Sequence, residues 1–182
     1  MNRTVFITGA TSGIGEAAAI KFASNGYRVI ITGRRSERLA LLAERLNQDY
    51  NVQVYQMCFD VRNNQEVVNA VKSLPTDWQN IDILINNAGL AVGLNTIDNG
   101  ILDDWERMID TNIKGLLYTT HCIVPLMKAK GSGHIINIGS IAGKEVYANG
   151  NVYCATKHAV DALNKAMRDR KSTRLNSSHV SQ

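Results

Sequence analysis

Five short apolar runs rich in β-branched residues alternate with helical segments along most of the chain, and this alternation constrains the fold more than any other feature. The apolar runs cover residues 4–9, 27–33, 52–61, 81–89 and 133–140. The segments between them have helical composition, as in 36–50, where Leu39, Leu42 and Leu46 recur on one face. Strands that alternate with helices predict right-handed crossovers and a parallel sheet with helices on both faces. The pattern therefore predicts an α/β, Rossmann-like, doubly wound domain over residues 1–170.

The second half of the chain is expected to hold the two longest helices. One covers residues from about 103 to 130 and is interrupted or kinked near Pro125, because proline lacks the N–H that an α-helix needs. The other covers residues 152–170. The continuous apolar sequences "VIIT" and "IDILI" are typical of strands that are buried on both faces.

Composition and charge exclude several classes of protein. No apolar run approaches the roughly 20 residues of a membrane-spanning helix, and the first residues run directly into a strand pattern, so neither a membrane partner nor a signal peptide is expected. Three cysteines without a CxxC pair fit a reducing cytoplasm. The net charge of +4 comes from residues after 164, since residues 1–164 carry equal numbers of acidic and basic side chains. A basic end without a groove-reading motif does not indicate a nucleic-acid partner.

A glycine-rich segment, "TGATSGIG" at residues 8–15, follows the first predicted strand and precedes the first predicted helix. Glycines here let the backbone turn tightly and approach a phosphate, while the next helix presents free N–H groups and the positive end of its dipole. A simple tight turn is the alternative. The candidate dinucleotide-binding residues of this segment are Gly9, Ala10, Thr11, Ser12, Gly13, Ile14 and Gly15.

Two arginines, Arg34 and Arg35, stand directly after the second predicted strand. Folds that bind NAD at this point usually place an acidic residue there, which accepts hydrogen bonds from the ribose hydroxyls. Guanidinium groups suit a 2′-phosphate instead, through paired, charge-assisted hydrogen bonds. NADP(H) is therefore the expected cofactor, and a solvated, charged start of the helix at Ser36 is the alternative.

Polar or small residues also follow the third and fourth predicted strands. Asp60 and Val61 end the third strand, where a carboxylate can accept from the adenine amino group and an apolar side chain can pack on the ring. Asp60 would serve equally well as the cap of the next helix. Asn87, Ala88 and Gly89 follow the fourth strand and are suited to lie against a cofactor, although they also make a good turn. The carboxyl ends of parallel strands meet at one edge, so these residues are expected to share one site.

A tyrosine and a lysine lie one helical turn apart at Tyr153 and Lys157, and Ser140 ends the fifth predicted strand. A cation beside a phenol favours the phenolate, which makes tyrosine a usable general acid or base near neutral pH. Taken singly, these residues would equally fit an ordinary helix surface and a turn.

Five motifs follow one another along the chain: "TGATSGIG", "NNAG", "DTNIKG", the strand end at Ser140 and "YCATK". In this order and spacing the chain resembles the short-chain dehydrogenase/reductase family over residues 3–168. The resemblance implies that Tyr153 is the general acid or base, that Lys157 holds the nicotinamide ribose and favours the phenolate, and that Ser140 orients the substrate oxygen. It also implies that Asn112 holds a water of a proton relay; a bend in the helix is the alternative for this asparagine.

Longer stretches, such as "WERMIDTNIKGL" and "HIINIGSIAG", are similar to the NADP-dependent 3-hydroxy acid dehydrogenases, a group that includes serine and allo-threonine dehydrogenases. This similarity implies hydride transfer between the nicotinamide and a small 3-hydroxy acid or its 3-oxo counterpart, in a cytoplasmic homotetramer. Relatives in the same family reduce 3-oxoacyl thioesters or simple ketones, so these substrates stay open. The four histidines show no metal-ligand spacing, and no metal is expected.

The end of the chain departs from the family pattern. Members of the family continue after the helix of the Tyr–Lys pair with a strand, a Pro-Gly turn, a substrate loop and a last strand, whereas this chain reads "RDRKSTRLNSSHVSQ". That segment is polar and basic and lacks a strand pattern. We therefore expect an incomplete domain over 1–170 that lacks the family's last strands, followed by a disordered tail over 171–182 that does not belong to the family pattern. A truncated gene and a junction with foreign sequence from about Arg170 are the two explanations. A non-catalytic NADP-binding remnant is the alternative to an active dehydrogenase.

Overall fold

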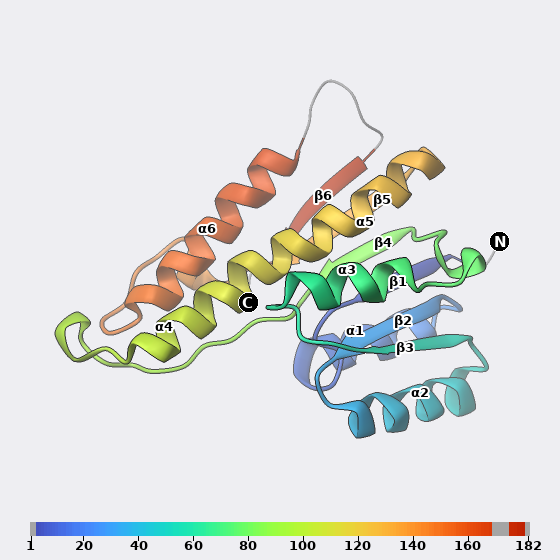
Figure 1. The fold of residues 1–182 in the computed structure, drawn as a ribbon, viewed down its shortest axis with the longest axis horizontal. Helices are drawn as coiled ribbons and strands as arrows, with labels where there is room; N and C mark the ends of the chain where they lie inside the picture. The colour runs from blue at the N-terminus through green and yellow to red at the C-terminus, as the bar shows by residue number, and fades with distance from the viewer. Residues whose placement is uncertain (1–2, 169–174, 181–182) are drawn as a thin grey trace.

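A parallel β-sheet forms the centre of the molecule (Figure 1). The structure, a computed structural model, describes residues 3–168 and 175–180. The strands within these ranges are β1 (Thr4–Ile7), β2 (Arg28–Gly33), β3 (Val54–Cys58), β4 (Ile83–Asn86), β5 (Gly133–Ile138) and β6 (Leu175–Val180). They lie in the order β3-β2-β1-β4-β5-β6, and every neighbouring pair is parallel. The chain adds β2 and β3 on one side of β1, then crosses back and adds β4, β5 and β6 on the other side. The strand order therefore switches between β1 and β4, as the predicted doubly wound fold requires.

Apolar residues alternate between the two faces of the sheet and form two cores. On β1, Phe6 belongs to one core, while Val5 and Ile7 belong to the other, and all three are fully buried. Helices α3 and α5 cover the first core, and helices α1 and α2 cover the second. The bounds of these helices are α1 (Gly13–Ala23), α2 (Ser36–Tyr50), α3 (Asn64–Lys72) and α5 (Leu116–Lys130). The three leucines predicted on one face of α2 are buried against the sheet.

The helix that carries the predicted tyrosine and lysine, α6 (Asn151–Met167), lies on the same face of the sheet as α5. Ile135 of β5 points into the core under α5, and Asn137, two residues later, points to the same face. Asn137 Nδ2 donates to Asn164 Oδ1 of α6 at 3.0 Å, and both side chains are buried. The prediction of a parallel sheet with helices on both faces is confirmed.

The predicted long helix consists of three parts. Helix α4 (Leu102–Ile109) continues into a π-helical turn, η3 (Asp110–Gly115), and then into α5. Helix α5 continues through Pro125, so an interruption there, the first of the two predicted possibilities, is wrong, while a kink at Pro125 stays a prediction. The helical geometry changes at η3. A Cβ on Gly115 would lie 2.8 Å from Val61 Cγ2, which shows that η3 is pressed against the loop after β3. Single π-turns of this kind occur often at functional sites.

The end of the chain differs from its prediction over the six residues of β6. This strand pairs in parallel with β5 along its full length, from Gly133 opposite Leu175 to Ile138 opposite Val180. Backbone hydrogen bonds hold an edge strand whatever its side chains are, which explains why polar residues without a strand pattern can form one. The predicted boundary at residue 170 lies outside the described residues. Across 3–168 and 175–180, no helix is both long and apolar enough to cross a bilayer.

Candidate active site

A cavity of about 420 Å³ opens where β1, β2, β3 and β4 end. Most of its walls come from the loops that follow these four strands, as the sheet order requires, and η3 contributes Thr111. The predicted residues that line the cavity are Gly9, Thr11, Ser12, Ile14, Arg34, Arg35, Asp60, Val61, Asn87, Ala88 and Gly89. Four further lining residues were not predicted, namely Gly33, Phe59, Leu90 and Thr111.

The glycine-rich loop depends on left-handed backbone and on close packing. Gly9 and Gly13 have φ angles of +65° and +57°, which favour glycine. A Cβ on Gly15 would lie 2.3 Å from the Gly9 carbonyl oxygen and 2.4 Å from Asn87 Nδ2. Gly15 and Ala10 are buried under the loop, so they shape the cavity without lining it.

The loops after β1 and β4 are joined by Thr8 and Asn87. The Thr8 hydroxyl oxygen accepts the backbone N–H groups of Asn87 and Ala88, each at 3.0 Å. The Asn87 side-chain amide donates to the carbonyl oxygens of Thr8 and Gly9, at 2.9 and 3.0 Å. Asn87 therefore holds the glycine-rich loop in place, a role beyond the turn or cofactor contact that its sequence suggested.

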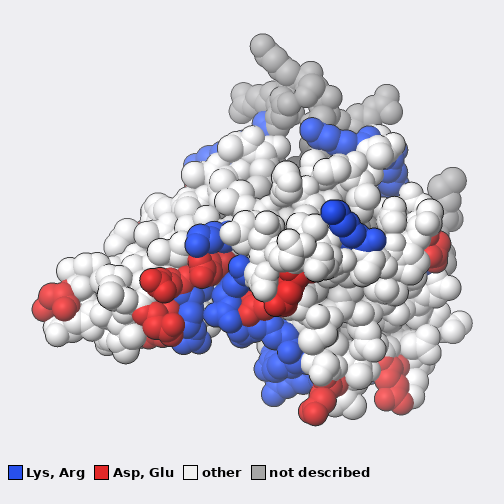
Figure 2. All heavy atoms as spheres, in the orientation of Figure 1, with Lys and Arg blue, Asp and Glu red and all other residues white. Residues whose placement is uncertain are grey.

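Both predicted arginines lie at the cavity. Arg35 Nη2 donates to Thr11 Oγ1 at 2.6 Å and to Ser12 Oγ at 3.0 Å, so its guanidinium group lies over the glycine-rich loop. The Arg34 side chain is 60% exposed, and its Nη1 lies 3.7 Å from Asp60 Oδ2. In Figure 2, basic and acidic side chains lie beside each other in the middle of the visible face. The cavity thus carries two guanidinium groups at the end of β2.

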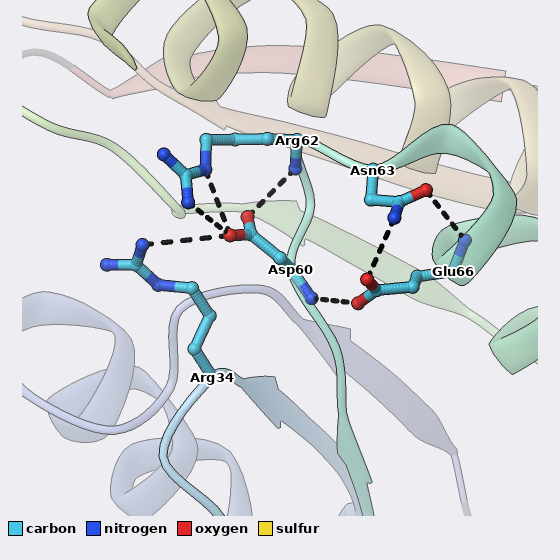
Figure 3. Close-up of polar contacts among 5 residues, drawn as sticks. All are labelled: Arg34, Asp60, Arg62, Asn63 and Glu66. Atoms are coloured by element: carbon cyan, nitrogen blue, oxygen red, sulfur yellow. Dashed lines mark hydrogen bonds and ion pairs between the residues drawn. The ribbon is translucent and has the colours of Figure 1, made fainter. Parts of the chain in front are cut away.

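The Asp60 carboxylate is held by Arg62, a residue that was not among the predicted ones (Figure 3). Arg62 Nε and Nη2 donate to Asp60 Oδ2 at 2.9 and 2.6 Å, and the Arg62 backbone N–H donates to Oδ1 at 3.0 Å. Partial burial alone would raise the pKa of Asp60, but the hydrogen bonds from Arg62 and the charges of Arg62 and Arg34 together hold that pKa below its usual value. Helix α3 is capped by Asn63, whose side chain accepts two backbone N–H groups, so the cap alternative for Asp60 is wrong.

Tyr153 and Lys157 lie on consecutive turns at the start of α6. Lys157 is only 7% exposed, and its Nζ donates to the Ile138 carbonyl oxygen at 3.0 Å and lies 5.8 Å from the centroid of the Tyr153 ring. Burial lowers the pKa of Lys157. A Cβ on Gly89 would lie 3.7 Å from Nζ, so the ammonium group also faces the loop after β4. The buried cation is thus placed between the tyrosine ring and the loops at the strand ends.

Asn112 lies in the π-turn η3 and is almost fully buried. Its Oδ1 accepts the Leu90 N–H at 2.7 Å, and its Nδ2 donates to the Leu90 carbonyl oxygen at 2.9 Å and to Thr156 Oγ1 at 3.0 Å. Thr156 Oγ1 in turn donates to the Tyr153 carbonyl oxygen at 2.8 Å. The asparagine therefore ties the loop after β4 to the helix of the Tyr–Lys pair. An amide oxygen has two acceptor positions, and the Leu90 N–H occupies one of those of Oδ1.

Ser140 lies two residues after the end of β5 and caps a short 3₁₀ turn, η4 (Ile141–Gly143), through a hydrogen bond from the Ala142 N–H to its Oγ at 3.1 Å. Gly143 brings η4 against α6, because a Cβ there would lie 2.7 Å from the Lys157 carbonyl oxygen. Direct packing of η4 on α6 therefore places Ser140 beside the helix of Tyr153. The alternative prediction, that Ser140 belongs to a turn, describes its local geometry correctly.

An ion-pair cluster fixes the segment after η4 to α6. Asp161 accepts from Lys144 Nζ at 2.8 Å and from Lys165 Nζ at 2.7 Å. Hydrogen bonds from these two ammonium groups lower the pKa of Asp161 to about 2. The cluster stabilises the position of the chain that follows Ser140.

Replacement of Asp161 by asparagine should lower the free energy of unfolding at pH 7 by about 1 kcal/mol, after allowance for solvent screening. The folded-state pKa lies below the unfolded value, so the contribution is present above pH ~4 and is lost as the pH falls toward 2. Urea unfolding at pH 7 and pH 3 measures this difference. Asp103→Asn, at an exposed ion pair with Arg107, is the control. A difference between Asp161→Asn and the unaltered chain that is the same at both pH values would contradict the assignment.

The family model of the short-chain dehydrogenases matches residues 3–175 of the chain. The chain belongs to the short-chain dehydrogenase family. Curated relatives of this short-chain dehydrogenase include the NADP-dependent 3-hydroxy acid dehydrogenase YdfG of Salmonella typhi, 52% identical over 153 residues, and sulfoacetaldehyde reductase 2 of Chromohalobacter salexigens, 44% identical over 169 residues. The alignments cover 84% and 92% of this chain, but only 60% and 66% of the relatives. The chain thus spans less than two thirds of the length of these relatives.

Solved structures give the same assignment. The crystal structure of serine dehydrogenase from Escherichia coli matches this short-chain dehydrogenase with a TM-score of 0.92 at 45% identity, over 98% of this chain and 81% of that chain. The closed form of serine dehydrogenase complexed with NADP⁺ matches with a TM-score of 0.91 at 44% identity, over 98% of this chain and 71% of that one.

Several residues of this short-chain dehydrogenase site were missed from the sequence. The missed residues include Thr8, Arg62 and Thr156. Each is next to a predicted site residue in the sequence, and this position was the one sign that it could belong to the site. A hydroxyl or guanidinium group gives no periodic pattern, so only its contacts reveal its role. In the part of the chain that the structure describes, His, Cys, Asp and Glu side chains form no group that could hold a metal ion.

Proposed function

We propose that this short-chain dehydrogenase binds NADP(H) and transfers hydride between the nicotinamide and a 3-hydroxy acid of the serine type, or its 3-oxo counterpart. The observation that carries the cofactor assignment is the pair Arg34 and Arg35 at the cavity, at the end of the strand where an NAD site usually has an acid. The names of the relatives agree with it, since YdfG is an NADP-dependent 3-hydroxy acid dehydrogenase and one serine dehydrogenase structure contains NADP⁺.

The cavity suits a dinucleotide in shape and in chemistry. Gly9 lines the cavity and α1 begins at Gly13, so the positive end of the helix dipole would face a bound phosphate. Val61 lines the wall where an adenine ring would pack, and Ala88 and Gly89 line the opposite loop. When bound, NADP⁺ would supply the hydride acceptor.

The protein's own residues supply the proton chemistry in this proposal. Tyr153 would take the proton from the substrate hydroxyl as hydride leaves, and would return it in the opposite direction. The ammonium group of Lys157, 5.8 Å from the centroid of the Tyr153 ring, would hold the nicotinamide ribose beside the tyrosine. Ser140 would donate its hydroxyl hydrogen to the substrate oxygen. Asn112 would hold the relay water at the remaining acceptor position of Oδ1.

A fluorescence titration of the purified chain with NADPH and with NADH tests the cofactor part of the proposal. We expect NADPH to bind at least about tenfold more tightly, because a charge-assisted hydrogen bond to the 2′-phosphate contributes on that order. Binding of NADH with equal or higher affinity would contradict the assignment of Arg34 and Arg35.

Turnover of serine or 3-hydroxypropionate with NADP⁺, followed as NADPH absorbance, tests the substrate part. Turnover of 3-oxoacyl thioesters or simple ketones alone would favour the other family activity. Tight NADPH binding without turnover of any of these would leave this chain with the role of an NADP-binding unit. A homo-oligomer and a cytoplasmic location stay predictions; light scattering of the purified chain tests the first, and a monomer mass would contradict it.

A further inference from the structure

The guanidinium group of Arg62 neutralises the Asp60 carboxylate, which also lies 3.7 Å from Arg34 Nη1. Both side-chain contacts from Arg62 reach Asp60 Oδ2, at 2.9 and 2.6 Å, and Oδ1 accepts the Arg62 backbone N–H at 3.0 Å. In Figure 3, dashed lines run to Oδ2 from both the Arg62 and the Arg34 guanidinium groups. The carboxylate is therefore satisfied mainly by Arg62.

The Asp60 backbone is fixed independently of these side chains. Glu66 Oε2 accepts the Asp60 N–H at 2.9 Å, and Glu66 Oε1 accepts from Asn63 Nδ2 at 2.8 Å. Asn63 in turn caps α3. The Asp60 main chain is thus anchored to the start of α3, and the aspartate should remain at the cavity when a side chain that binds its carboxylate is removed.

Arg34 makes a looser contact than Arg62. Its Nη1 lies 3.7 Å from Asp60 Oδ2, an ion-pair distance that is too long for a hydrogen bond. The side chain is 60% exposed and lines the cavity, whereas the Arg62 side chain is 32% exposed. Because Asp60 is already hydrogen-bonded to Arg62, Arg34 is held near the carboxylate without being bound tightly to it.

We propose that Arg62 is a positioning residue for cofactor selection: by binding the Asp60 carboxylate, it leaves the donors of Arg34 available to the 2′-phosphate of NADP(H). This inference rests on the proposed function. Without Arg62, the Asp60 charge would attract Arg34 into direct hydrogen bonds and would repel the phosphate. Both effects act on the phosphorylated dinucleotide and leave NADH, which lacks the 2′-phosphate, largely unaffected.

The test compares NADPH and NADH affinity in Arg62→Met, measured by fluorescence titration. We expect the dissociation constant of NADPH to rise about ten- to a hundredfold, and that of NADH to change less than about threefold. Arg62→Lys should lie between Arg62→Met and the unaltered chain, since lysine keeps the charge but not the paired donors. Arg45→Met is the matched control, because it removes the same charge from exposed ion pairs with Glu16 and Asp49.

A second variant distinguishes the effect of the Asp60 carboxylate from the effect of losing the Arg62 side chain. Asp60→Asn in the Arg62→Met background should restore most of the NADPH preference, because the amide neither repels phosphate nor binds Arg34 as an ion pair. Three results would overturn the role of Arg62. Arg62→Met could weaken the binding of NADPH and NADH equally, it could change the affinity for neither, or Asp60→Asn could fail to restore the preference for NADPH. An unaltered chain that binds neither nucleotide, or prefers NADH, would overturn the proposed function and this inference together; the unaltered chain is therefore titrated first.

Discussion

Replacement of Tyr153 by phenylalanine should lower kcat with NADP⁺ and the best 3-hydroxy acid about a thousandfold, since general acid–base catalysis typically contributes 10²- to 10⁴-fold. The substitution removes only the hydroxyl group. The ring stays beside Lys157, and the Thr156 hydrogen bond to the Tyr153 carbonyl oxygen does not depend on the side chain. We therefore expect unchanged NADPH affinity and an unchanged midpoint of thermal unfolding, so the loss should appear in kcat alone.

Tyr118→Phe is the matched control, because it also removes one phenolic hydroxyl group. Tyr118 lies on α5 and packs against the core. It should keep kcat within about threefold of the unaltered chain, as expected of a substitution outside the site. Steady-state kinetics at several pH values, together with NADPH titration, provide the comparison. A Tyr153→Phe variant with more than a tenth of the original kcat would show that another group carries the proton.

Replacement of Gly15 by alanine should lower the free energy of unfolding by about 3 kcal/mol, at the upper end of the usual cost of overpacking. The new Cβ would lie 2.3 Å from the Gly9 carbonyl oxygen and 2.4 Å from Asn87 Nδ2. These two atoms are hydrogen-bonded to each other at 3.0 Å, so the methyl group would force apart the loops after β1 and β4. Urea unfolding measures the loss, and NADPH affinity should fall more than tenfold because the loop loses its shape.

Gly26→Ala is the control for this substitution. Gly26 has a φ of +75°, but no atom lies within 4 Å of its Cβ position, so alanine there should cost only the strain of left-handed backbone, about 1 kcal/mol. Gly26 follows α1 at the opposite end from the cavity, and its substitution should leave NADPH affinity unchanged. A similar loss of stability for Gly15→Ala and Gly26→Ala would mean that the loops adjust to the added methyl group at little cost.

Local sequence patterns predicted the elements that obey a regular period. The apolar runs became β1 to β5, and the leucines of α2 became part of the core, because strand and helix periods place successive side chains on fixed faces. The cavity was predictable for the same reason, since parallel strands bring the loops at their carboxyl ends to one edge. Patterns failed at η3 and β6, where close packing against Val61 and backbone pairing with β5 decide the structure.

The sequence by itself determined the parallel α/β fold, most of the residues that line the cavity and the family of the chain, because each depends on residue type and spacing. Only the tertiary structure decided what each polar group contacts. It showed Asn87 holding the glycine-rich loop, Asn112 joining Leu90 to Thr156, and Arg62 rather than Arg34 hydrogen-bonded to Asp60. Hydrogen bonds and ion pairs depend on distances between atoms that are far apart in the chain, and a periodic sequence pattern contains no such distances.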